Sequence, residues 1–173
     1  MPLTPDEKDW TWVLERPCLE CGFDPADVPR EHFARTVRDS ANTWTTVLTR
    51  EGVTERARED RWSDLEYGCH VRDVYRITEG RLASMLNEDD PLFQNWDQDE
   101  TALSERYDLQ DPTTVSAELT LAAAQFAERI DAIAPNEWSR TGTRSNGSHF
   151  TVETLIRYSL HDLLHHEWDV TRG

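Results

Sequence analysis

The segment Asp111–Ile133, DPTTVSAELTLAAAQFAERIDAI, decides the fold class of this chain. Its apolar residues recur every three or four positions, which is the period of an amphipathic helix: Val115, Leu119, Ala122, Phe126, Ile130 and Ile133. Asp111 and Pro112 precede this stripe, and an aspartate N-cap followed by proline is a typical helix start. We therefore predict a long helix with one buried face.

Three further segments show the same period, at about residues 30–49, 64–86 and from Thr151 onward. Ser63 and Glu66 form a Ser-x-x-Glu capping box at the start of the second. No run of strands is convincing, so the sequence predicts an all-α four-helix bundle with one long crossover. That crossover is the acidic segment 87–110, in which a short helix is possible, and residues 134–150 fit a small hairpin or a loop.

Two parts of the chain differ in character. Residues 1–29 form an N-terminal extension that contains Cys18 and Cys21, and residues 30–173 form the bundle domain. The apolar side chains of Trp10, Trp12 and Val13 would dock the extension on the bundle.

The composition limits the possible partners. The 173 residues carry a formal net charge of −16 and contain no basic run, so we expect neither nucleic acid nor anionic lipid to bind. The first ten residues lack the features of a signal peptide, and no apolar run approaches the ~20 residues of a membrane span. We expect a cytoplasmic protein that acts on a small molecule.

Three of the six histidines lie in the segment Tyr158–Val170, YSLHDLLHHEWDV. On a helix, His161 and His165 are ~40° apart around the axis and about 6 Å apart along it, so one metal ion can contact both. His166 lies about 140° from His161, which favours a surface, packing or supporting role.

A third ligand must come from another element, and the candidates are His32, His70 and His149. We choose His70 because it lies within the second helix, on or beside its apolar face. Three imidazoles with open positions would make a catalytic site. The simpler alternative is that His-x-x-x-His occurs by chance and that His70 is a hydrogen-bonded core residue.

The pair Cys18 and Cys21 has three interpretations, in this order: a tight turn near Gly22 that is sometimes oxidised, a redox pair, or half of a zinc site. An odd number of cysteines does not make a disulfide framework. Cys69 is interpreted as a small core residue. Asp162 and Asp169 could orient histidines, although half-exposed acids on a helix are commoner.

Two motifs resemble the DinB/YfiT-like family. The segment Arg61–Val74, RWSDLEYGCHVRDV, is similar to its Trp-Ser-x-x-Glu-x-x-x-His segment, and Phe150–Val170 is similar to its closing helix with a His-Asp-x-x-His-His signature. The resemblance implies a bundle with up-down-down-up helix order, often a homodimer. It also implies a divalent metal, often nickel or zinc, on three histidines that match His70, His161 and His165.

The family's known activities include transfer of low-molecular-weight thiols such as mycothiol or bacillithiol to electrophiles. Our leading hypothesis is therefore a metal-dependent thiol transferase, in which the thiol cofactor supplies the nucleophile. The alternatives are a metal-dependent hydrolase that activates water, and a non-catalytic metal-binding, stress-associated protein. The sequence assigns no catalytic or cofactor-binding side chain beyond the three ligands.

Overall fold

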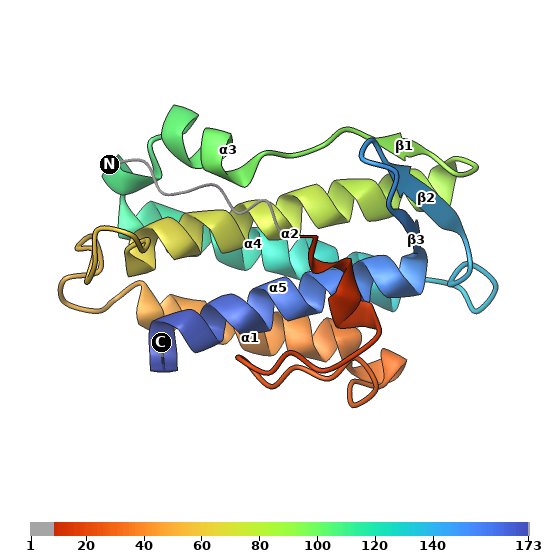
Figure 1. The fold of residues 1–173 in the computed structure, drawn as a ribbon, viewed down its shortest axis with the longest axis horizontal. Helices are drawn as coiled ribbons and strands as arrows, with labels where there is room; N and C mark the ends of the chain where they lie inside the picture. The colour runs from red at the N-terminus through yellow and green to blue at the C-terminus, as the bar shows by residue number, and fades with distance from the viewer. Residues whose placement is uncertain (1–8, 173) are drawn as a thin grey trace.

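A computed structural model describes residues 9–172 of the chain, and its main feature is a set of four long helices (Figure 1). They are α1 (Phe33–Val47), α2 (Asp64–Asn87), α4 (Pro112–Asp131) and α5 (Val152–Arg172). These helices lie within or close to the four predicted ranges. The protein is mostly helical, as predicted.

Two of the helix starts are fixed by the residues that the sequence indicated. Ser63 Oγ accepts a hydrogen bond from the backbone N–H of Glu66 at 3.2 Å, and the Glu66 carboxylate accepts one from the N–H of Ser63 at 2.8 Å. This reciprocal pair satisfies backbone donors that a helix start leaves unpaired. At the start of α4, Asp111 accepts a hydrogen bond from the N–H of Thr114 at 2.8 Å.

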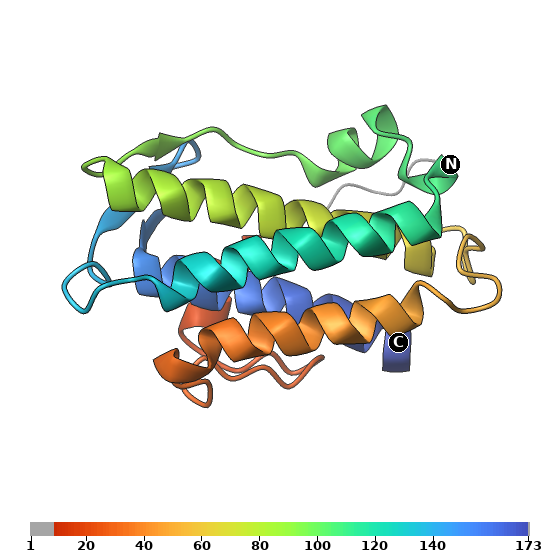
Figure 2. The same cartoon turned by 180° about the vertical axis from the view of Figure 1, so that it is seen from behind.

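The four helices share one apolar core. Helix α4 packs against both α2 and α1, and α5 packs against the same two helices; seen from behind, α4 lies between α2 and α1 (Figure 2). The largest side chains at the centre are fully buried, among them Trp44, Tyr75, Phe126 and Leu160. The bundle can therefore hold side chains on its inner faces in fixed positions.

The connections contain a small sheet that the sequence analysis only partly anticipated. Strands β2 (Thr141–Arg144) and β3 (His149–Thr151) form an antiparallel hairpin, in the segment where a hairpin was one of two options. Strand β1 (Leu92–Phe93) pairs with β2 in parallel, with Leu92 opposite Thr143. Two residues carry no alternating pattern, so β1 could not be found from the sequence.

The link between α2 and α4 also contains α3 (Gln98–Ser104) and the 3₁₀ turn η3 (Tyr107–Leu109). The short helix that was possible in this segment is therefore present. The link between α2 and α4 also places residues 95–99 at the edge of a pocket beside α5.

The N-terminal segment lies over α5. Its first turn is the 3₁₀ helix η1 (Trp10–Leu14), which contacts α5, and a second one, η2 (Arg30–His32), leads into α1 (Figure 1). Val13 is fully buried, and Trp10 packs against two histidines of α5. Residues 1–8 of the predicted extension lie outside the described residues. No helix in residues 9–172 is long and apolar enough to cross a membrane.

Candidate metal centre

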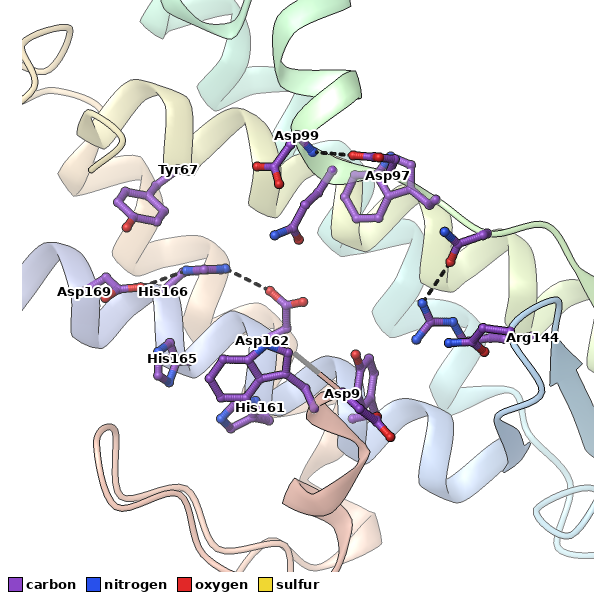
Figure 3. A pocket seen from close by; sticks show the side chains of 16 residues that line it. Asp9, Tyr67, Asp97, Asp99, Arg144, His161, Asp162, His165, His166 and Asp169 are labelled. Carbon is purple, nitrogen blue, oxygen red and sulfur yellow. Dashed lines mark hydrogen bonds and ion pairs between the residues drawn. The ribbon is translucent and has the colours of Figure 1, made fainter. Parts of the chain in front are cut away.

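Helix α5 carries two adjacent rows of polar side chains. His161 and His165 form one row and face the N-terminal segment, whereas Asp162, His166 and Asp169 form the next (Figure 3). Successive helical residues are ~100° apart, so neighbours such as His165 and His166 point in different directions. This offset assigns the histidines of α5 to two different groups.

The first group consists of His70 from α2 with Asp162 and His166 from α5. One ligand atom from each lies within 4.8 Å of the other two. The Nε2 atoms of His70 and of His166 each lie 3.2 Å from the same atom, Oδ1 of Asp162. Two imidazoles and a carboxylate therefore converge on one point between the helices.

Asp169 supports this group from the next turn of α5. Nδ1 of His166 lies 2.9 Å from Oδ2 of Asp169, where an N–H donates to the carboxylate. Burial alone would lower the pKa of His166, but its hydrogen bonds to Asp162 and Asp169 raise it to about 9. Burial would raise the pKa of the Asp162 carboxyl, but hydrogen bonds from His166 and His70 hold it well below its usual range.

His70 is completely buried, and burial lowers its pKa, so its imidazole is neutral near pH 7. Its ring stacks on Trp96, with centroids 5.4 Å apart and planes only 7° from parallel. Nδ1 of His70 has no hydrogen-bond partner among residues 9–172. Nε2, the other ring nitrogen, is the atom that faces Asp162, so His70 would offer Nε2 to a ligand in this group.

These residues fit a divalent metal ion. A His–His–Asp set matches the ligands that zinc and similar ions take in catalytic sites, where three protein ligands leave a position open. The hydrogen bond from His166 Nδ1 to Asp169 leaves Nε2 as the nitrogen that faces the group. This carboxylate–histidine arrangement is a common support for metal-ligating histidines.

The second group consists of His161, His165, Cys18 and Cys21, with one ligand atom from each within 4.8 Å of the others. Sγ of Cys18 lies 3.7 Å from Nδ1 of His165. All three cysteines of the chain are free thiols in the structure.

The predicted ligand set of His70, His161 and His165 is thus divided between the two groups. The helical offset correctly separated His166 from His161, but it could not show that the row of His166 faces α2. The spacing of Asp162 and His166, also four residues, was the signal for the first group. Instead, His166 was predicted to have a surface, packing or supporting role, and Asp162 to be a half-exposed acid or a residue that orients a histidine.

The other candidates have structural roles. His149 lies in the hairpin, where its Nδ1 is 2.9 Å from Oγ1 of Thr143, and His32 is exposed in η2. Cys69 is a buried core residue, as predicted, with Sγ 3.5 Å from Oε1 of Gln110.

A cavity of about 710 Å³ opens beside the first group. Asp162 and His166 lie in its wall, and the Trp and Tyr side chains that line it come from four different parts of the chain: Trp10, Tyr67, Trp96 and Tyr158. Tyr67 from α2 and Tyr158 from α5 border this pocket on two sides. The cavity is large enough for a small organic substrate together with a small cofactor.

The pocket wall is acidic, and its described lining lacks four common nucleophilic residue types. Five aspartates and a single arginine are among its lining residues: Asp9, Asp97, Asp99, Asp162, Asp169 and Arg144 (Figure 3). Within residues 9–172, no Ser, Thr, Cys or Lys lines it. Covalent catalysis by Ser, Thr, Cys or Lys is therefore not available from the described lining of this pocket.

Comparison with known proteins supports the fold and the family. The model of the DinB superfamily matches residues 34–169. A solved structure described as "YfiT from Bacillus subtilis is a probable metal-dependent hydrolase with an unusual four-helix bundle topology" is similar with a TM-score of 0.74. The identity is 14%, over 87% of this chain and 92% of that one, so this likeness concerns the fold. The search of curated proteins found no significant match.

Proposed function

The chain belongs to the DinB superfamily, and from this premise we propose that it is a metal-dependent enzyme that transfers a low-molecular-weight thiol to a small electrophile. The proposed ligands are His70, Asp162 and His166, which replaces the set predicted from the sequence. The single observation that carries the proposal is this three-ligand group, two members of which, Asp162 and His166, lie in the wall of a large pocket whose described lining has no Ser, Thr, Cys or Lys.

In this proposal the nucleophile comes from outside the chain, as the sulfur of the thiol. A divalent ion, zinc or nickel, would supply a positive charge that lowers the pKa of a bound thiol. Asp169 holds His166 in one tautomer, and Trp96 packs on His70, so both imidazoles are fixed before the thiol arrives.

The proposed reaction is a substitution. The thiol loses its proton, its sulfur forms a bond to the electrophilic carbon, and the leaving group departs with its electron pair. Asp97 and Asp99 lie in the pocket wall and can accept the proton.

The charge of the pocket favours one class of thiol. Five aspartates against one arginine disfavour anionic thiols such as glutathione and bacillithiol. Carboxylates accept hydrogen bonds from hydroxyl groups, and the four aromatic rings offer flat apolar faces. An uncharged, polyhydroxylated thiol of the mycothiol type fits these features best.

A hydrolase is the second candidate. It ranks lower because the sequence fixes no Glu beside the predicted ligands by spacing. Asp97 and Asp99 in the pocket wall favour it, because a carboxylate near an ion-bound water can act as a general base. A metal-binding protein without catalytic activity is the remaining alternative.

Several predictions from the sequence, on location, assembly, partners and helix order, remain part of the proposal. We propose a cytoplasmic homodimer that binds no nucleic acid and no membrane. The up-down-down-up helix order is also part of the proposal, and it is supported by the colour gradient in Figure 1, which runs in one sense along α2 and α4 and in the other along α1 and α5.

The test is an assay of thiol consumption. Zinc-loaded and nickel-loaded protein would be mixed with monochlorobimane and, in turn, mycothiol, bacillithiol, glutathione and cysteine. We expect turnover with mycothiol above all, its loss with a chelator, and its return when metal is added. His166→Ala should abolish turnover, whereas His32→Ala, an exposed control, should not change it.

The opposite pattern would decide against thiol transfer. If no thiol is consumed and the metal-loaded protein hydrolyses esters or amides, the hydrolase is correct. If neither reaction occurs with either metal, the protein binds metal without catalysis.

A further inference from the structure

We infer that Cys18, Cys21, His161 and His165 form a second, closed zinc site that fastens the N-terminal segment to α5. This site is separate from the proposed catalytic group, since none of its four residues belongs to that group. It has a structural purpose, so it stands or falls independently of the proposed enzymatic activity.

The ligand types and their spacing are those of structural zinc. The chain supplies Cys-x-x-Cys from one segment and His-x-x-x-His from one helix, which is the spacing of Cys₂His₂ sites. The sequence alone left zinc as the third interpretation of the cysteines because two more ligands were missing. The fold supplies them as His161 and His165, and His161 follows Cys21 by 140 residues in the sequence.

The distances suit a tetrahedral ion. Zinc bonds of ~2.3 Å to sulfur and ~2.0 Å to nitrogen place neighbouring sulfur and nitrogen ligands about 3.6 Å apart. Sγ of Cys18 and Nδ1 of His165 are 3.7 Å apart. All four ligand atoms lie within 4.8 Å of one another, so small side-chain movements bring them to one ion.

The loop of the cysteines has the shape of a ligand turn. The N–H of Gly22 donates to the carbonyl of Cys18 at 2.9 Å, and the N–H of Cys18 donates to the carbonyl of Phe23 at 2.8 Å. Gly22 has a φ of +77°, a left-handed conformation that glycine adopts without strain. The turn brings both thiols to the same side, facing α5.

Both histidines have a nitrogen available for the ion. Nε2 of His161 is buried and has no hydrogen-bond partner in the described part of the chain. Nε2 of His165 lies 3.5 Å from the carboxylate of Glu20, one of the two residues between the cysteines. That carboxylate favours a proton on Nε2, which leaves Nδ1, the atom that faces Cys18, free to bind zinc.

Aromatic side chains shield the site from solvent. Trp10 has its ring centroid 5.6 Å from that of His161 and 5.5 Å from that of His165, and Phe23 lies 5.5 Å from His161. Cys18 is 2% exposed and His161 is 4% exposed. His161 and His165 also border the large pocket, but four protein ligands would complete the tetrahedral shell of a zinc ion and leave no coordination position for a substrate, which is the mark of a structural site.

A redox role for the cysteines fits the structure less well. A dithiol pair would need only Cys18 and Cys21, yet His161 and His165 lie within the same 4.8 Å group. Two histidines in the same group have no purpose in a simple dithiol pair. A zinc ion accounts for all four side chains together.

The site has a consequence for the pocket. Asp9 and Trp10 lie in the pocket wall, and they precede Cys18 by fewer than ten residues. By holding this segment on α5, zinc would keep one wall of the pocket in place.

The first experiment is X-ray absorption spectroscopy on zinc-loaded full-length His70→Ala/His166→Ala protein, in which the catalytic group is removed. We expect one equivalent of zinc with two sulfur ligands at about 2.3 Å and two nitrogen ligands at about 2.0 Å. Zinc without sulfur in its ligand shell, or no bound zinc, would overturn the inference.

A second experiment uses the wild-type chain, so that it does not depend on the folding of a variant. Mass spectrometry would follow the alkylation of each cysteine while a chelator removes zinc. Cys18 and Cys21 should become reactive as one equivalent of zinc is released, whereas the core residue Cys69 should not respond. Cys21 is partly exposed. If it is alkylated at the same rate with and without zinc, the proposed site is contradicted.

Discussion

Nδ1 of His166 lies 2.9 Å from Oδ2 of Asp169. This bond sets which nitrogen of His166 faces Asp162 and His70, and it therefore prepares the imidazole to act as a ligand. Neighbouring carboxylates that hold metal-ligating histidines contribute substantially to metal affinity.

The substitution Asp169→Asn tests this support. We expect the affinity of the first site for zinc to fall roughly 10–100-fold, because a neutral amide orients the imidazole less firmly. Competition with a chromophoric chelator measures the change. Asp131→Asn, at an exposed ion pair with Arg38, is the control and should leave the affinity unchanged.

Two adjacent histidines should give opposite results when each is replaced. His166→Ala should remove the sulfur-free zinc and the thiol-consuming activity. His165→Ala should remove the zinc that is bound by cysteines and keep most of the activity. Metal content and turnover of the two purified variants provide the measurement, and an inverted pattern would show that the two groups are assigned the wrong way round.

Sequence reasoning predicted the bundle because each long helix has its own apolar period and, in α2 and α4, its own start signal. Asp111 and the Ser63–Glu66 pair mark helix ends through local hydrogen bonds, which the sequence contains in full. The short strand β1 depends on pairing with β2, a distant segment, and carries no local signal.

The candidate site could be predicted only in part, because local patterns indicate which residues share a helix face but not which distant segment that face meets. The period of α5 showed that His161 and His165 share one face and that His166 does not. Which of these faces meets His70 depends on how α5 is rotated against α2, and that is set by packing across the whole core. Cys18 and His165 are 147 residues apart in the sequence, so their contact could not be predicted from the sequence either.

Gly68 is expected to be essential for the packing of α2 on the residues that follow α1. A Cβ atom at this position would lie 2.8 Å from Cδ2 of Leu48. Gly68→Ala should therefore destabilise the protein by about 1–3 kcal/mol. Gly80 is in the same helix with open space around it, so Gly80→Ala should instead stabilise by roughly 0.4–1 kcal/mol. Urea denaturation of both variants measures the difference; equal destabilisation would contradict the close contact.

Glu66 is expected to make the stability depend on acid pH. Burial alone would raise the pKa of its carboxyl, but hydrogen bonds from Arg56 and from the N–H of Ser63 lower it overall. Because the pKa is about 4.3 in the unfolded chain and lower in the folded one, this stabilisation is present above about pH 4.3. It is lost as the pH falls through the folded-state pKa.

The variant Glu66→Gln should lose about 1–3 kcal/mol at neutral pH, because the side chain is buried and a neutral amide pairs more weakly with Arg56. The difference from the wild type should shrink as the pH falls below about 4.3. Thermal or urea unfolding across this range measures it, with Glu51→Gln, an exposed loop residue, as the control. A difference that is constant with pH would rule out the ionised carboxylate as its source.

The proposed ligand set is tested most directly by anomalous X-ray diffraction from crystals of the zinc-loaded protein, recorded on both sides of the zinc absorption edge. We predict a peak enclosed by His70, Asp162 and His166, in addition to the one expected beside Cys18 and Cys21. A single peak shared by His70, His161 and His165, or no peak near His70, would contradict this account of the metal centre.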